Sequence, residues 1–145
     1  MNATDTFDMQ LDAQAPDIGE LVNRLQVCFD ARGLPSKLFQ SFAMAFDEVI
    51  SNIAAYGSAH DPIRIRVTFG ADDVRAEVID DGVAFDPLQL PDPDVTSSVD
   101  ERAIGGLGVY LVRKMMDDVA YERRERFNCL MFRKRIVAAP DLPRT

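Results

Sequence analysis

The spacing of apolar residues changes from a helical period to a period of two along the chain, and this order limits the available folds. Two segments with helical spacing, near residues 17–33 and 36–57, precede two alternating segments near residues 63–69 and 74–78. A parallel doubly wound sheet needs strands and helices that alternate regularly, and this order lacks that alternation. It therefore favours a mostly antiparallel sheet with helices on one face.

Boundary signals support both helices. Asp17 and Glu20 have the spacing of a capping box, and Gly33 provides a stop for the first helix. Ser36 is expected to cap the second helix, which ends near Gly57. Both segments are therefore predicted as amphipathic helices.

The remaining elements complete a count of five strands and three helices. A short strand is expected at residues 7–11, a third helix after Gly108, and two closing strands near residues 119–123 and 128–137. The predicted fold class is α+β, a two-layer α/β sandwich whose mostly antiparallel sheet is covered on one face by the helices.

Composition indicates one globular domain spanning residues 1–145. A net charge of -8 and a pI near 4.6 disfavour a general DNA or RNA binder, because phosphate contacts need clustered Lys and Arg. No apolar run approaches the roughly 20 residues of a membrane span, and no secretory signal pattern opens the chain. A cytoplasmic location is expected. Residues 86–104 lack periodicity and are predicted as a binding loop or lid, and residues 138–145 as a tail.

Glu48 and Asn52 are four residues apart, so they lie on one face of the second helix. A carboxylate there can activate a hydroxyl, and an amide oxygen can complete a Mg²⁺ shell otherwise made by phosphate oxygens. The alternative is a solvated polar pair on an amphipathic helix.

Asp80 and Gly82 follow a strand that the alternation predicts to be half-buried. A carboxylate at a strand end can accept a hydrogen bond from an exocyclic amine such as N6 of adenine, and a nearby glycine permits close backbone approach. The alternative is an ordinary Asp-Gly turn.

Three glycines, Gly105, Gly106 and Gly108, open the third helix. Free backbone N–H groups and the helix dipole favour a phosphate at such a start. The alternative is a flexible hinge of the lid.

Together, and in this order, the three motifs resemble the GHKL ATPase superfamily. Phe46–Asn52 is similar to its N box, Asp80–Pro87 to its first glycine box and Gly105–Val112 to its second. Residues 115–121 and the short chain further resemble the anti-sigma regulatory serine kinases, and this similarity covers nearly the whole chain.

The resemblance implies a Bergerat-type fold that binds ATP and Mg²⁺. By it, Glu48 is the general base, Asn52 the Mg²⁺ ligand, and Asp80 the adenine contact with Gly82 beside it. Some family members have an arginine just before the second glycine box; here that place holds Ala103 and Ile104, and Arg102 is the nearest substitute in the catalytic set. The remaining cofactor-binding residues are expected to be Phe85, Gly105, Gly106, Leu107 and Gly108.

The implied reaction moves the γ-phosphoryl group of ATP to a serine of a STAS-type anti-anti-sigma protein, which frees or traps a sigma factor. A homodimer is expected by analogy with relatives. One alternative is a module that binds ATP or ADP and captures a partner without phosphoryl transfer. A third hypothesis is the detached catalytic domain of a sensor histidine kinase.

Overall fold

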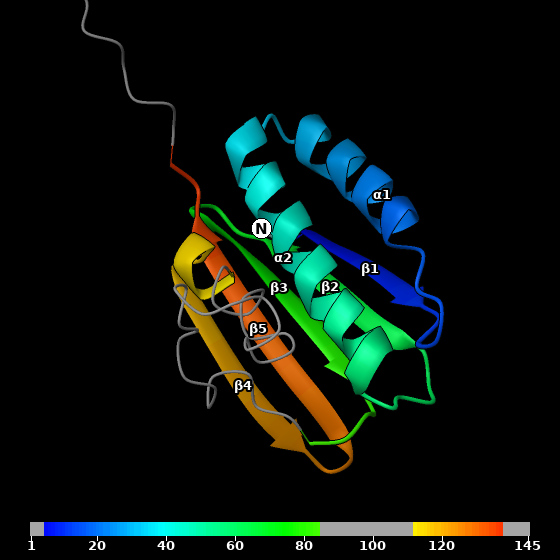
Figure 1. The fold of residues 1–145 in the computed structure, drawn as a ribbon. Helices are drawn as coiled ribbons and strands as arrows, with labels where there is room; N and C mark the ends of the chain where they lie inside the picture. Colours follow the sequence, from blue (N-terminus) through cyan, green and yellow to red (C-terminus); the bar gives the residue numbers. More distant parts are fainter. Residues whose placement is uncertain (1–4, 85–111, 138–145) are drawn as a thin grey trace, which may run out of the picture.

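A computed structural model describes residues 5–84 and 112–137, which form one antiparallel five-stranded sheet with helices on one face (Figure 1). The strand order is β1-β2-β3-β5-β4. The predicted α+β two-layer fold is confirmed. The elements are β1 (Asp5–Leu11), α1 (Ile18–Ala31), α2 (Ser36–Tyr56), β2 (Ile63–Phe69), β3 (Asp73–Asp80), β4 (Asp118–Arg124) and β5 (Phe127–Arg135).

The third predicted helix is described only at its end. Residues 112–115 are helical, and Val112 and Met116 join the core on the helical side of the sheet. The helix start after Gly108, the lid at residues 86–104 and the tail at residues 138–145 lie outside the described residues.

β5 lies between β3 and β4, so the chain leaves the sheet after β3 and returns one strand further on. In the β3–β5 pair, Asp80 lies opposite Asn128 and Val78 opposite Leu130. This register places the end of β3 beside the beginning of β5. Residues separated by almost fifty positions in sequence therefore meet where β3 ends and β5 begins, on the helix-covered face of the sheet.

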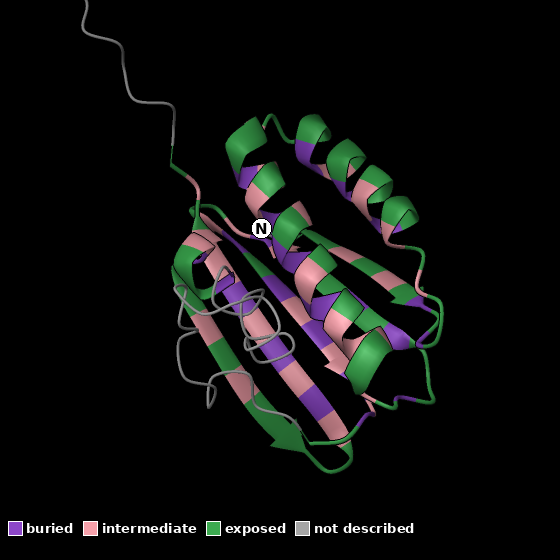
Figure 2. Ribbon diagram, in the orientation of Figure 1, coloured by how far each residue is buried: buried purple, intermediate pink, exposed green. Residues whose placement is uncertain are grey.

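The core follows from the period-two alternation of the strands against the apolar stripes of the helices. Figure 2 shows buried bands recurring along β3 and β5. Phe42 and Phe46 of α2 pack on Phe132 of β5 with ring centroids 5.8 and 5.2 Å apart. Complete burial of each ring contributes about 1.5–3 kcal/mol, so this cluster fixes α2 over the centre of the sheet.

The helix starts confirm one capping prediction and correct another. Asp17 Oδ1 accepts a hydrogen bond from Glu20 N at 3.0 Å, as the capping box predicts. The Ser36 cap is wrong: the N-cap residue of α2 is Pro35, in an extended conformation and without a side-chain hydrogen bond. The fixed φ of proline presents its carbonyl to the backbone N–H groups of Leu38 and Phe39, so the helix starts without a polar cap.

Arginines of the closing strands are partly held in ion pairs on the sheet. Arg133 contacts Asp73 at 3.0 Å and also pairs with Asp118. The hydrogen bonds that Arg133 donates to Asp118 and Asp73 raise its pKa. These contacts join β3, β4 and β5 at the end of the sheet remote from Asp80.

Among the described helices, none has the length and apolar character needed to cross a lipid bilayer.

Candidate functional site

Asp80 ends β3 with its side chain inside the protein, only 6% exposed. Its Oδ1 accepts hydrogen bonds from Gly82 N at 2.8 Å and from Asn128 Nδ2 at 3.1 Å. No hydrogen bond from the described residues reaches its other oxygen, Oδ2. One side of the carboxylate is therefore fixed by the protein, and the other remains an acceptor for a ligand.

Gly82 is the point where the turn after β3 touches the end of α2. A Cβ on this residue would lie 2.3 Å from the carbonyl oxygen of Gly57 and 2.8 Å from Asp80 Oδ1. Next to it, Val83 N donates to the same Gly57 oxygen at 2.8 Å. The close approach requires glycine, and it joins the Asp80 turn directly to α2.

A second contact, between the turn and the loop that follows α2, comes from Asp81, which lies between Asp80 and Gly82 in the sequence. Its Oδ1 accepts hydrogen bonds from His60 N at 2.8 Å and Asp61 N at 3.1 Å, in the loop after α2. Burial opposes ionisation of Asp81, but the backbone donors at His60, Asp61 and Asp81 outweigh it and lower the pKa. The charged carboxylate thus helps hold the loop against the turn.

Glu48 and Asn52 occupy successive turns of α2, and both are half-buried. Asn52 is five residues before Gly57, about 7.5 Å along the helix axis from the contact with the Asp80 turn. Its Nδ2 is buried and finds no hydrogen-bond partner among the described residues. Because an unpaired buried donor costs about 1–3 kcal/mol, this amide is suited to a polar ligand.

Three further residues, which no sequence motif indicates, line the site. Asn128 of β5 is buried, and its Oδ1 accepts from the hydroxyl of Tyr121 and from Arg123 Nη1 at 3.1 Å. Arg123 also donates to the carbonyl oxygen of Gly82 at 2.9 Å. A polar residue at an inward position of a strand was the available signal, since Leu130 and Phe132 follow Asn128 on that face.

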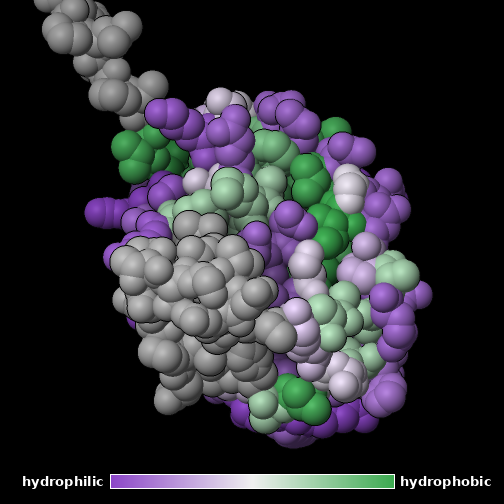
Figure 3. Space-filling view, in the orientation of Figure 1, coloured by the Kyte–Doolittle hydropathy of each residue, from purple (hydrophilic) through white to green (hydrophobic). Residues whose placement is uncertain are grey.

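Two exposed apolar side chains lie next to the Asp80 turn: Tyr56 at the end of α2 is 54% exposed and Val83 is 55% exposed. On the face shown in Figure 3, other apolar surface lies over the helical layer. The remaining predicted site residues lie outside the described residues: Phe85, Arg102, Gly105, Gly106, Leu107 and Gly108.

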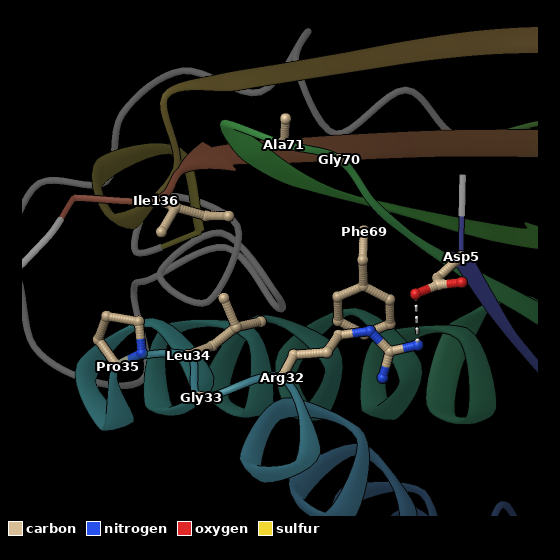
Figure 4. A pocket seen from close by; sticks show the side chains of 9 residues that line it. All are labelled: Asp5, Arg32, Gly33, Leu34, Pro35, Phe69, Gly70, Ala71 and Ile136. Atoms are coloured by element: carbon tan, nitrogen blue, oxygen red, sulfur yellow. Dashed lines mark ion pairs between the residues drawn. The ribbon is translucent and has the colours of Figure 1, made fainter. Parts of the chain in front are cut away.

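A groove of about 620 Å³ lies elsewhere, between the α1–α2 connection and the β2–β3 turn (Figure 4). Arg32 lies 4.0 Å from the ring centroid of Phe69 and pairs with Asp5 at 3.5 Å. The length of β3, about 23 Å, separates this groove from Asp80. Since its one cation is already engaged, we do not place the candidate site there.

Comparison with known proteins gives a family match over most of the chain. Residues 11–134 match the histidine kinase-like ATPase domain. The serine/threonine-protein kinase BtrW of Bordetella bronchiseptica is 30% identical over 98 residues, 66% of this chain and 69% of BtrW. The serine-protein kinase RsbW of Bacillus cereus is 25% identical over 137 residues, 90% of this chain and 86% of RsbW.

Solved structures support the same fold. The RsbU and RsbW domains of Rv1364c from Mycobacterium tuberculosis superpose with a TM-score of 0.67 at 16% identity, over 92% of this chain. This chain spans 33% of the mycobacterial chain. The histidine kinase AdeS of Acinetobacter baumannii has a TM-score of 0.54 at 10% identity, covering 90% of this chain and 68% of AdeS. The resemblance seen in the three motifs is confirmed, and the chain belongs to the histidine kinase-like ATPase domain family, with serine-protein kinases among its relatives.

Proposed function

We propose that this protein is an anti-sigma factor serine kinase. It binds Mg-ATP in the cytoplasm and phosphorylates a serine of a STAS-type anti-anti-sigma protein. The transfer changes which partner holds a sigma factor. The observation that carries the proposal is the hydrogen bond from Val83 N to Gly57 O, because it holds the Asp80 turn against the helix that carries Glu48 and Asn52.

The base of the nucleotide is assigned to Asp80. Its Oδ2 is an acceptor with no described partner, in a residue that is only 6% exposed. An exocyclic amine such as N6 of adenine supplies the matching donor. Phe85 and the exposed Val83 are proposed to lie beside the base.

The phosphates and Mg²⁺ are assigned to α2 and the glycine-rich segment. The buried amide of Asn52 fits this role, since its oxygen is a hard ligand and its Nδ2 needs an acceptor. Within the described residues no three His, Cys, Asp or Glu side chains cluster as a metal site. That fits a cation held largely by phosphate oxygens, which neutralises charge on the triphosphate. Gly105, Gly106, Leu107 and Gly108 are proposed to supply backbone contacts to the phosphates.

Glu48 is proposed as the general base. It accepts the proton of the partner's serine hydroxyl while the serine oxygen bonds to the γ-phosphorus. The bond between the γ-phosphorus and the β–γ bridging oxygen breaks, and ADP leaves. Arg102 is proposed to stabilise the charge on the transferred group.

The relatives named serine-protein kinases support this reaction over other ATP-dependent chemistry. A homodimer belongs to the proposal by analogy with such relatives. A module that binds nucleotide without transfer is the second candidate. It is favoured by Ala84, which replaces the second glycine of the usual D-x-G-x-G pattern, and by Ala103, near which some family members have an arginine.

The test is incubation with γ-labelled ATP, Mg²⁺ and candidate STAS proteins. The kinase proposal expects label on a partner serine, lost when that serine is changed to alanine. Glu48→Gln is expected to lower the transfer rate at least 100-fold with little change in ATP affinity. Asp47→Asn is the matched control, because Asp47 is an exposed carboxylate on the same helix. Nucleotide binding without labelled partner would favour the second candidate.

A further inference from the structure

We infer that Asn128 is a positioning residue that makes the site select an amino-bearing purine, by holding Asp80 so that one carboxylate oxygen faces the ligand. This inference rests on the proposed role of Asp80 and adds to it a residue from a different strand. Asn128 acts through Asp80 and need not touch the base.

Asp80 and Asn128 form a buried polar pair. Among the described residues they are the two polar side chains that are buried, each 6% exposed. They lie directly opposite each other in the β3–β5 register. Burying polar groups without partners is costly, so their mutual hydrogen bond is needed for both to occupy this place.

The amide of Asn128 has only one chemically consistent orientation. Its oxygen accepts from the guanidinium of Arg123 at 3.1 Å and from the hydroxyl of Tyr121. Its Nδ2 donates to Asp80 Oδ1 at 3.1 Å and to Val83 O at 2.8 Å. A guanidinium cannot accept a hydrogen bond, so the nitrogen of the amide must face Asp80.

Arg123 fixes the other side of the same arrangement. It donates to Gly82 O as well as to Asn128, so the turn and the amide share one anchor on β4. β5 separates β4 from β3, and the contacts therefore cross two strand boundaries (Figure 1). The result is a turn whose carboxylate is held directly by Asn128 of β5 and indirectly, through Asn128 and Gly82, by Arg123 of β4.

As a consequence, the two carboxylate oxygens of Asp80 have different partners. Oδ1 accepts from Gly82 N and Asn128 Nδ2, which uses both of its acceptor positions. Oδ2 is left for the ligand and can only accept. It therefore matches the amino group of adenine and opposes the O6 carbonyl of hypoxanthine, whose lone pairs would face it without a proton between them.

The experiment compares ATP and inosine triphosphate, measured by calorimetric titration with Mg²⁺ on the full chain. The wild type is expected to bind ATP at least 10-fold more tightly than inosine triphosphate. Asn128→Asp keeps the size of the side chain but places a second carboxylate against Asp80. Two facing carboxylates hold one proton between them, which provides an O–H donor for a carbonyl. The ATP preference is expected to fall at least 10-fold.

Two further variants distinguish the positioning of Asp80 by Asn128 from the effect of an added charge and from a loss of folding. Gln10→Glu adds the same charge by the same amide-to-acid change at an exposed position of β1, and is expected to leave the preference unchanged. Tyr121→Phe removes one donor to the Asn128 oxygen and leaves Arg123 in place, so a fall of about 2–5-fold is expected. If Asn128→Asp does not fold, Tyr121→Phe decides.

An unchanged preference in folded Asn128→Asp, or an equal loss of affinity for both nucleotides, overturns the inference, since a merely structural role would act on both alike. If the inference about Asn128 is overturned in this way but the wild type still prefers ATP, the proposed nucleotide site itself stands. A wild type that binds neither nucleotide overturns the proposed function and this inference together.

Discussion

The two sides of the candidate site differ in how many of their polar groups already have hydrogen-bond partners. On the sheet side, Asp80 Oδ1 and the amide of Asn128 are each held by two or more contacts. On the helix side, Asn52 Nδ2 is buried without a partner in the described part of the chain. The sheet side is thus built into the fold, while the helix side retains a polar group that is available to a ligand. Changes on the two sides should therefore have opposite effects on the stability of the free protein.

The largest effect is expected from Gly82→Ala. The added Cβ would overlap the Gly57 carbonyl, and backbone atoms cannot move aside as a flexible side chain can. Overpacking of this kind costs about 3 kcal/mol of unfolding free energy, measured by urea denaturation. Gly19→Ala in α1 is the control, because its Cβ would meet only Asp17 Oδ1 at 3.6 Å. A Gly82→Ala protein as stable as the wild type would show that the turn is not packed on α2.

Asp80→Asn is next. The substitution replaces a carboxylate, whose two oxygens both accept, by an amide with one acceptor oxygen and one donor nitrogen. The amino group of adenine would then be buried without an acceptor, and we expect the affinity for adenine nucleotides to fall on the order of 100-fold. Calorimetric titration of ATP and ADP measures the loss. Asp72→Asn, an exposed change in the β2–β3 turn, is the matched control and should bind as the wild type does. Equal affinities for Asp80→Asn and wild type would remove Asp80 from the site.

Asn52→Ala should separate the two sides most sharply. Removing a buried donor without a partner, and introducing a better helix former, should raise the unfolding free energy of the free protein by about 0.5–1 kcal/mol. The same change should reduce the Mg²⁺ dependence of ATP binding about 10-fold. Thermal unfolding with and without Mg-ATP measures both. A destabilised free protein would mean that Asn52 already has a structural partner.

The smallest effect is expected from Asp81→Asn, on the stability of the protein at acidic pH. Hydrogen bonds lower the pKa of Asp81 below its ordinary 3.8 in the folded state. Its stabilising contribution is therefore complete above the unfolded pKa and is lost as the pH falls through the lower folded value. Asp81→Asn should flatten the acid limb of a pH–stability curve, and leave the slope above neutral pH unchanged. An identical acid limb in both proteins would show that Asp81 is not a charge-dependent tether.

Much of the fold could be predicted from local pattern. Period-two alternation marked β2 and β3, and helical stripes with Asp17 and Gly33 marked α1, because these signals depend on neighbours in sequence. The start of α2 could not be predicted in the same way. A proline carbonyl replaces the expected side-chain cap, and this is decided by the conformation of the preceding turn.

The candidate site was predictable only where its residues stand in recognisable spacing. Glu48, Asn52, Asp80 and Gly82 carry that spacing, and the structure brings their two elements together through Gly57 and Val83. Asn128 does not, because its contact with Asp80 depends on β5 pairing with β3 across 48 residues. Pairing at that distance follows from topology and not from the local sequence.

The placement of β5 between β3 and β4 also has a consequence for synthesis on the ribosome. Until residues 127–135 have emerged, β3 has a bare edge and Asp80 lacks its amide neighbour. Bare strand edges invite pairing with other chains. A nascent chain can thus assemble the α1, α2 and β1–β3 portion early, but the proposed nucleotide site is completed only when β5 pairs with β3, so on this proposal shorter chains cannot bind the nucleotide.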